Sequence, residues 1–295
     1  MQHRTKGFAA ILLSIAILCS PVGFLAAPGS EEAGRKGLPN PFFAMDTATN
    51  RQLPAKAQIA LVKELGYAGI GCDMGQMPAM LQAADEAGVK LFSVYVGANV
   101  DPAKPRYDPR LKEVIPSLKG RDTLVWLFIT GAKPSSTDRD EQAVATIREI
   151  ADLAAEAGLR VALYPHAGFY VERVEDALRL VKKADRKNVG VTFNLCHWLK
   201  VDKEENLKPL LTQAMPHLYL VTINGADSGG QNWDTLIQTL DRGTFDNFGL
   251  LKTLKELGYA GPIGFQGYGI KGDARNILER TMNGWRKLSA RLSAE

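Results

Sequence analysis

Short apolar runs alternate with amphipathic segments along almost the whole chain beyond residue 40. The amphipathic segments repeat apolar residues at helical spacing, as Ala57, Leu61 and Leu65 do. The apolar runs are rich in branched and aromatic residues, which favour strands. Eight such runs lie at Phe42–Met45, Ala68–Cys72, Leu91–Val96, Leu124–Ile129, Val161–Leu163, Val189–Phe193, Leu218–Ile223 and Ile263–Phe265. Eight strands, each followed by a helix, in a chain of 295 residues predict an α/β protein with a single (β/α)8 TIM barrel.

Two further features favour the barrel over an open doubly wound sheet. A doubly wound sheet that binds a nucleotide carries a glycine-rich loop after its first strand, whereas Asp46–Thr49 follows the first strand here. The segment Lys63–Gly71 recurs in similar form as Lys255–Gly264, and both copies have the pattern of a helix end, a turn and a strand. A quasi-symmetric barrel repeats this unit, so the recurrence supports the same fold.

The first residues have the composition of a secretory signal peptide. Arg4 and Lys6 precede a short apolar run, and small residues follow at Ala26 and Ala27. The boundaries that we predict are a signal peptide over 1–27, a polar linker over 28–40 and the barrel domain over 41–295. An uncleaved membrane anchor is the alternative, because the leader approaches the length that spans a bilayer. The signal predicts export, to the periplasm.

Charge and cysteine content exclude several classes of partner and site. The formal net charge is +4; Arg4 and Lys6 in the acid-free leader supply two of these charges, so the remainder carries 4 − 2 = +2. No basic block supports nucleic-acid binding, and we expect no membrane contact beyond a possible N-terminal anchor. Cys72 and Cys196 are the only cysteines after the leader, which excludes a disulfide framework, and we expect buried thiols.

Polar and aromatic side chains follow the predicted strands. The carboxyl ends of barrel strands converge on one cavity, so these side chains are expected to form a pocket there. We predict His166, His197 and Asp73 as catalytic residues. The predicted substrate-binding residues are Asp46, Tyr164, Asn194, Trp198, Asn224, Trp233 and Gln266. Two long loops, over 97–109 and 224–246, also follow strands and are expected to cap a substrate.

This set of side chains suits a carbohydrate. Amides and hydroxyl groups hydrogen-bond to sugar hydroxyls, and an indole such as that of Trp233 packs against the apolar face of a sugar ring. Histidine titrates near neutral pH, so His166 and His197 are candidate acid/base groups. Asp46 and Asp73 could serve as bases, or could cap the helices that follow them. His217 stands at the start of a strand and is expected to be structural.

Three stretches carry a resemblance to a known family: Ala162–His166, Asn194–His197 and Gly258–Gln266. From about Pro41 to the last helix, the chain resembles the sugar phosphate isomerase/epimerase group of xylose isomerase-like TIM barrels. The resemblance implies one divalent metal, held by a glutamate, an aspartate, a histidine and a second glutamate at four strand ends. It also implies proton transfer between adjacent sugar carbons through an enediolate.

The resemblance places the metal ligands of the family at four positions that do not match them. These positions hold Tyr164, Asn194, Asn224 and Gln266, whereas a histidine that touches substrate in the family is kept as His197. Divalent cations prefer anionic oxygens or imidazole, and the four substituted side chains are neutral near pH 7. We therefore expect the family's metal to be lost or weakly bound. A weaker site that uses His166 or His197 with Asp73 stays open, and the cofactor is unknown.

The leading hypothesis is an exported isomerase, epimerase or lyase that acts on a carbohydrate through His166 and His197. Export favours an unphosphorylated sugar, because phosphorylated metabolites are mostly cytoplasmic. The alternative is a non-catalytic, exported sugar-binding or accessory protein on a degenerate isomerase scaffold. A phosphodiesterase of the related endonuclease barrels would need several metal ligands that the chain lacks. The oligomeric state is left open.

Overall fold

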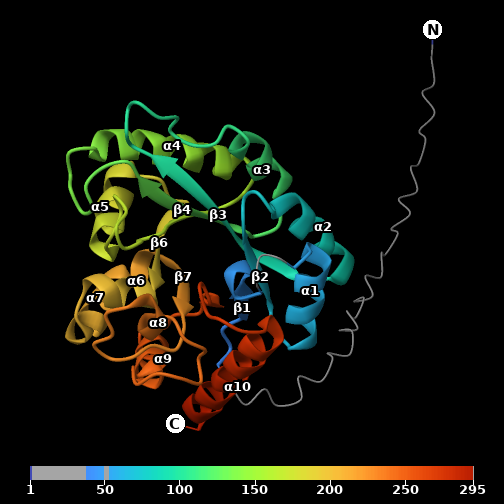
Figure 1. The fold of residues 1–295 in the computed structure, drawn as a ribbon. Helices are drawn as coiled ribbons and strands as arrows, with labels where there is room; N and C mark the ends of the chain where they lie inside the picture. Colours follow the sequence, from blue (N-terminus) through green and yellow to red (C-terminus); the bar gives the residue numbers. More distant parts are fainter. Residues whose placement is uncertain (2–37, 50–52, 295) are drawn as a thin grey trace. The chain divides into compact units, whose positions relative to one another are not determined.

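The computed structural model describes Met1, residues 38–49 and residues 53–294. The predicted signal peptide and most of the predicted linker, up to residue 37, lie outside the described residues apart from Met1. In the barrel domain, eight parallel strands pair in sequence order, and β1 also pairs with β8, so the sheet is closed (Figure 1). The strands are β1 Phe42–Met45, β2 Gly69–Asp73, β3 Lys90–Asn99, β4 Leu124–Thr130, β5 Val161–Leu163, β6 Val189–Asn194, β7 Leu218–Ile223 and β8 Ile263–Phe265. The predicted (β/α)8 barrel is confirmed.

Helices surround the strands and bury an apolar stripe against them (Figure 1). The α-helices are α1 Ala55–Glu64, α2 Met77–Ala87, α3 Leu111–Ser117, α4 Asp140–Glu156, α5 Val174–Ala184, α6 Leu195–Val201, α7 Leu207–Ala214, α8 Trp233–Leu236, α9 Asn247–Glu256 and α10 Ala274–Ser293. Short 3-10 turns lie at η1 Asp46–Thr49, η2 Glu204–Asn206 and η3 Met215–His217. Within the described residues, no helix combines the length and the apolar character that crossing a bilayer requires.

The recurrent segment occupies equivalent places in two βα units, as its sequence predicts. α1 and α9 both end one residue before a leucine, and a glycine with positive φ follows in each case, Gly66 at 84° and Gly258 at 77°. Glycine adopts this left-handed conformation without the steric cost of a Cβ atom, which turns the chain into the next strand.

Strands β3 and β4 are longer than the others, and β3 is longer than its sequence predicts. It runs to Asn99 rather than Val96 because Gly97, Ala98 and Asn99 stay in register with β4. The loop then folds back on the strand end, with an antiparallel bridge between Ala98 and Tyr107. The β3 and β4 walls therefore extend further toward the carboxyl end than the short strands β5 and β8.

The barrel interior is filled at its amino end and hollow at its carboxyl end. Phe43 and Phe92 stack with ring centroids 4.8 Å apart, and both are buried together with Leu124 and Leu220. Above this layer, side chains from the strand ends enclose a cavity. This division places the candidate site where the sequence predicts it, at the carboxyl ends of the strands.

Candidate functional site

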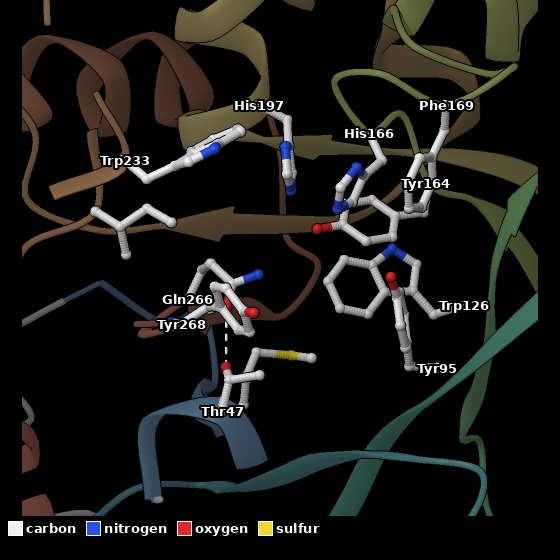
Figure 2. A pocket seen from close by; sticks show the side chains of 12 residues that line it. Thr47, Tyr95, Trp126, Tyr164, His166, Phe169, His197, Trp233, Gln266 and Tyr268 are labelled. Carbon is white, nitrogen blue, oxygen red and sulfur yellow. Dashed lines mark hydrogen bonds between the residues drawn. The ribbon is translucent and has the colours of Figure 1, made fainter. Parts of the chain in front are cut away.

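A cavity of about 380 Å³ opens at the carboxyl end of the barrel (Figure 2). Its lining comes from most of the βα units of the barrel, which is why residues far apart in the sequence meet there. The lining residues are Met45, Thr47, Tyr95, Trp126, Tyr164, His166, Phe169, His197, Trp233, Ile237, Gln266 and Tyr268. Aromatic rings dominate the set, and it contains no Asp, Glu, Lys or Arg. The cavity is therefore nearly free of formal charge.

Three aromatic rings form one wall of the cavity (Figure 2). Trp126 of β4 stacks on Tyr164, which follows β5, with centroids 4.1 Å apart. Tyr95 of β3 meets both rings edge-on, at 5.6 Å from Trp126 and 5.5 Å from Tyr164. Trp126 Nε1 donates to Thr192 Oγ1 at 3.0 Å, which fixes the indole. The wall is thus a rigid apolar surface against which a planar or ring-shaped ligand can pack.

Two exposed aromatic side chains stand at the mouth of the cavity. Trp233, the first residue of α8, is 43% exposed, and Tyr268, after β8, is 63% exposed. Apart from Met1, they are the only large apolar side chains exposed on the described part of the chain. Exposing such surface costs free energy that a bound ligand would recover, so the pair marks a binding site.

His166 lies in the loop between β5 and α5, half-buried in the cavity wall. Its Nδ1 lies 3.0 Å from the main-chain oxygen of Ala167. Because a carbonyl oxygen only accepts, Nδ1 must carry the proton, and the neutral ring then has its lone pair on Nε2. Burial lowers the pKa of His166, so the imidazole is neutral and basic near pH 7.

His197 lies in the first turn of α6 and packs against His166, with ring centroids 3.8 Å apart. It is 6% exposed, and its Nδ1 is buried without a hydrogen-bond partner among the described residues. Burial, together with the charge that His166 can carry, holds the pKa of His197 well below its usual value. Figure 2 shows the tip of the His197 ring directed into the cavity. Two imidazolium rings at this distance would repel, so at most one of the two rings is positively charged.

Tyr164 supplies the most deeply buried hydroxyl group of the cavity. Asn194 Nδ2 donates to Tyr164 Oη at 3.2 Å, and a hydrogen bond from Gln266 also favours the ionised form. Burial nevertheless raises the pKa of Tyr164 well above its usual value, so the phenol stays protonated. Gln266 is itself held by Thr47, whose Oγ1 donates to Gln266 Oε1 at 2.9 Å (Figure 2). The phenolic proton is thus available to an acceptor in the cavity.

Behind the loop that carries His166, a network of charged groups around the buried carboxylate of Asp140 anchors the chain. Tyr170 Oη donates to Asp140 Oδ1 at 2.6 Å, and Arg179 and Lys183 contact the same carboxylate at 3.0 and 2.6 Å. Burial opposes ionisation of Asp140, but hydrogen bonds from Lys183, Tyr170 and Arg179 lower its pKa. We call Asp140, Tyr170, Arg179 and Lys183 the anchor network. It fixes the loop from behind and does not line the cavity.

The two predicted aspartates do not line the cavity. Asp73 Oδ1 accepts from the main-chain nitrogens of Gly75 at 2.7 Å and Gln76 at 3.1 Å, and Oδ2 accepts from the Gln76 side chain. Asp46 is fully buried, and its Oδ2 accepts from the main-chain nitrogen of Asp73 at 3.1 Å. Asp46 thus holds the backbone at the end of β2, and Asp73 holds the turn between β2 and α2. Both accept main-chain hydrogen bonds, but neither caps the helix that follows it, which the sequence left as an alternative.

Three other predicted binding residues also face away from the cavity. Asn194 caps α6, where its Oδ1 accepts from His197 N at 3.3 Å, and it reaches the site only through Tyr164. Asn224 Nδ2 donates to the main-chain oxygens of Gly225 and Leu236, which fastens the loop after β7. Trp198 is 4% exposed and packs against Phe193 within the core. These side chains support the site from behind.

The structure therefore brings together five of the predicted site residues and adds others. His166, His197, Tyr164, Trp233 and Gln266 line the cavity, as the sequence predicts. The other lining residues, which are not among the predicted site residues, are Met45, Thr47, Tyr95, Trp126, Phe169, Ile237 and Tyr268. Tyr95 and Trp126 lie within strands rather than at their ends. Their signal was the alternation of residues along each strand, since every second side chain of a barrel strand points inward.

The residues at the family's metal positions do not fit a divalent cation. Tyr164 stays protonated, Asn194 and Asn224 lie outside the cavity lining, and Gln266 Oε1 already accepts from Thr47. Asn224 Oδ1 is buried without a hydrogen bond, but as a neutral amide it brings no charge to balance a cation. Within the described residues, no three His, Cys, Asp or Glu side chains gather as a metal site requires. Asp73 holds the turn before α2 and does not line the cavity, so the weaker set with the histidines is not assembled either.

Comparison with known proteins places the chain in a family. The model of the xylose isomerase-like TIM barrel family matches residues 59–288. The chain belongs to this family. A comparison with curated proteins finds no match. As a xylose isomerase-like barrel, the chain has the closed eight-stranded sheet and the carboxyl-end cavity described above, but not a carboxylate-rich lining.

Solved structures with the same fold include several enzymes. One is a 3-keto-D-glucoside 4-epimerase from E. coli, with a TM-score of 0.67 and 17% identity over 84% of this chain and 99% of that one. A D-allulose 3-epimerase from Methylomonas sp. has a TM-score of 0.65 and 15% identity over 85% and 98% of the two chains. A probable 3-DHS dehydratase from Bacillus anthracis has a TM-score of 0.67 and 14% identity over 82% and 97%. At these identities, the similarity establishes the fold.

Proposed function

We propose that this protein is a sugar isomerase or epimerase in which a histidine pair replaces the metal-held carboxylates of its family. The observation that carries the proposal is the neutral, closely packed pair His166–His197, whose ring centroids lie 3.8 Å apart in a cavity without formal charge. A neutral imidazole that presents an unprotonated Nε2 is a general base of suitable strength near pH 7.

In the proposed reaction, His166 Nε2 removes a proton from the carbon next to a sugar carbonyl. The imidazolium that forms is stabilised by the ring of Phe169, which stacks on it with centroids 3.8 Å apart. His197 stays neutral beside it, because its pKa is lowered further by a charge on His166. The proton on the imidazolium exchanges with solvent. A proton that returns from His166 to the neighbouring carbon, while the enediol hydroxyl proton passes to the former carbonyl oxygen, gives an isomer. A proton that water delivers to the opposite face of the original carbon gives an epimer, and His166 then releases its own proton to the solvent.

The negative charge that develops on the carbonyl oxygen needs a hydrogen-bond donor. Tyr164 is suited to this, because its phenol stays protonated in the buried site and its oxygen is oriented by Asn194 at 3.2 Å. A fixed donor of this kind is a common means of stabilising an oxyanion. Tyr164 thus takes over, in part, the electrostatic work that a metal does elsewhere in the family.

The cavity lining favours an uncharged, unphosphorylated sugar. No Lys or Arg lines the cavity to bind a phosphate, and the aromatic wall suits the apolar face of a ring. This preference agrees with the proposed export of the protein. Two of the similar structures bear the names 3-keto-D-glucoside 4-epimerase and D-allulose 3-epimerase, which supports carbohydrates that carry a carbonyl group as the first candidates.

Deuterium exchange tests this proposal. Aldoses, ketoses and keto-glycosides are incubated with the protein in D2O, and uptake of deuterium at carbon is followed by NMR. We expect exchange with the wild type and a loss of about 10²-fold or more in the His166→Gln and His197→Ala variants. His217→Gln, a histidine remote from the cavity, is the control. Full exchange in both cavity variants would refute the assignment of the base.

A second candidate function is non-catalytic sugar binding. The observation that favours it concerns Asn194 and Asn224, which stand at two of the family's ligand positions. Their side chains form hydrogen bonds with main-chain atoms of the protein and do not line the cavity. Calorimetry with the same sugar panel, followed by turnover assays on each sugar that binds, separates the two functions. Tight binding without exchange or product at high protein concentration would favour the binding role.

A further inference from the structure

A second hollow adjoins the cavity along strands β3 and β4. It has a volume of about 450 Å³ and is lined by the ends of both strands and by the loop 105–109. Phe128 of β4 separates the two spaces: it lines the second hollow and stacks on Tyr95 of the cavity wall, with ring centroids 4.6 Å apart. Phe128 also lies 5.4 Å from Phe169 of the cavity wall. We call the second hollow the upper groove.

The cavity and the upper groove are successive levels of one wall. Along β4, Trp126, Phe128 and Thr130 share a face, because side chains of a strand alternate. Trp126 pairs with Tyr95 and faces the cavity, whereas Phe128 pairs with Gly97 and faces the groove. The length of β3 and β4, which continue past the other strand ends, produces the second level.

Gly97 makes the aromatic floor of the upper groove possible. A Cβ atom at position 97 would collide with the tip of the Phe128 ring, so only glycine leaves room for the ring to lie against β3. Phe128 is only half-buried, and its outer face is therefore open to the groove. A half-exposed aromatic face on a strand floor is a surface on which a sugar ring can stack.

Polar groups frame this aromatic floor, and the frame is held in place. Asn99 Nδ2 donates to Thr130 Oγ1 at 3.2 Å; an amide carries two N–H donors, so one is left for a ligand. Arg106 is paired with Glu149 at 2.6 Å, and its main-chain oxygen accepts from Asn99 N at 2.7 Å. These contacts pre-organise the groove, which reduces the ordering cost of binding.

We propose that the upper groove binds a second sugar ring, so that the substrate is a disaccharide or a related glycoside rather than a free monosaccharide. The inference rests on the proposed function, because it takes the cavity as the place of the reacting ring. The second ring stacks on Phe128 and hydrogen-bonds to Asn99 and Thr130. The continuity of the two levels through Tyr95 and Phe128 favours one ligand that spans both over two separate ligands.

Calorimetry with defined sugars tests the inference. The probes are cellobiose, maltose and lactose, each compared with glucose and galactose. For the wild type we expect at least one disaccharide to bind about tenfold more tightly than its monosaccharides. The Phe128→Leu variant keeps an apolar side chain but loses the ring, and we expect it to weaken disaccharide binding about fivefold to tenfold while monosaccharide binding changes less than twofold. Asn99→Ala provides a second, independent variant with a smaller loss.

The matched control is Phe92→Leu, the same substitution on β3 at the filled amino end of the barrel. Equal effects of Phe128→Leu and Phe92→Leu, or equal affinities of the wild type for disaccharides and monosaccharides, would overturn the inference. If the protein prefers disaccharides but shows no deuterium exchange, the upper groove remains a sugar-binding site and the proposed catalysis is refuted. Absence of binding by every sugar would remove both.

Discussion

Tyr164 and Tyr170 lie in the same stretch of chain after β5, and both are buried, but they belong to different parts of the molecule. Tyr164 lines the cavity and takes part in a neutral, aromatic surface. Tyr170 belongs to the anchor network, where its hydroxyl donates to the carboxylate of Asp140. Burial raises the pKa of both phenols, but the charge of Asp140 contributes only for Tyr170. Charged side chains thus lie in the anchor network behind the site, whereas the cavity itself has a lining without charged residues.

This division implies that substitutions in the two regions have different consequences. In the cavity they should change activity and leave the free energy of unfolding almost unchanged. In the anchor network they should lower the free energy of unfolding and affect activity mainly through the position of the loop. The following predictions test the division, from the largest expected effect to the smallest.

Asp140→Ala should have the largest effect. It leaves Arg179 and Lys183 without the carboxylate that both contact. Asp140 is buried but Lys183 is half-exposed, so we expect a loss of about 3 kcal/mol, at the lower end of the cost of breaking a buried charged cluster. Urea unfolding followed by circular dichroism measures the loss. Asp152→Ala removes an exposed partner of Arg186 and is the control, with a much smaller expected loss. Similar losses for the two variants would mean that the anchor network is not a stabilising element.

Tyr164→Phe should lower the rate of the reaction rather than the stability of the protein. It removes the hydroxyl group proposed to stabilise the oxyanion, and loss of such a donor typically lowers kcat about 10²- to 10³-fold. The ring and its stacking on Trp126 are kept, so the melting temperature should change little. Rates of deuterium exchange and a thermal melt of the same sample provide the two readouts. A normal rate in this variant would exclude the oxyanion role.

Tyr170→Phe is the matched substitution in the anchor network. A hydrogen bond to a charged group contributes about 1.5–3 kcal/mol, so the free energy of unfolding should fall by about that amount. The rate of exchange per folded molecule should stay within a fewfold of the wild type. If instead Tyr170→Phe lowered kcat as much as Tyr164→Phe, the separation of the two regions would fail.

The histidine pair predicts a dependence of stability on pH. Burial lowers the pKa of His166 and His197 in the folded state, so between those values and about 6.5 the unfolded chain binds more protons than the folded one. Their contribution is fully present above about pH 6.5 and is lost as the pH falls. The slope is about 1.4 kcal/mol per pH unit for each histidine over that range. Urea midpoints at pH 7.5 and 5.5, compared between the wild type and His197→Gln, isolate the effect from the carboxylates; equal slopes would contradict it.

Asp73→Ala should have the smallest effect. The carboxylate accepts from the main chain of Gly75 and Gln76 in the turn before α2, and loss of such a hydrogen bond typically costs about 1 kcal/mol. Because Asp73 does not line the cavity, the exchange rate should not change. Asp73→Asn, which keeps an acceptor, should recover most of the stability. A large loss of activity in both variants would show instead that Asp73 takes part in catalysis.

The fold was largely predictable from the sequence, because eight apolar runs and the repeated glycine turns follow directly from residue type. The upper end of β3 was not, since Gly97–Asn99 are held in the strand by pairing with β4 and by the returning loop, both non-local contacts. Local sequence patterns thus determine that a strand forms, whereas its contacts with distant segments determine where the strand ends.

The candidate site was predictable in position but only partly in membership. His166, His197 and Gln266 follow strands and do face the cavity. Asp73 and Asn194 end strands and Asn224 follows one, but their short side chains reach the adjacent backbone first and bond there. The position of a residue in the sequence predicts that it lies at the carboxyl end of the barrel. Whether its side chain points into the cavity depends on the turn that follows the strand.

The group that sets the basic nitrogen of His166 is the main-chain oxygen of Ala167. Every amino acid at position 167 would bring the same oxygen, so no single exchange of a side chain there removes it. Descendants of this chain could alter the aromatic walls and thus the sugar they accept, while inheriting the same lone pair. The backbone would thus preserve the basic nitrogen of His166, whereas the residues that determine sugar specificity could change.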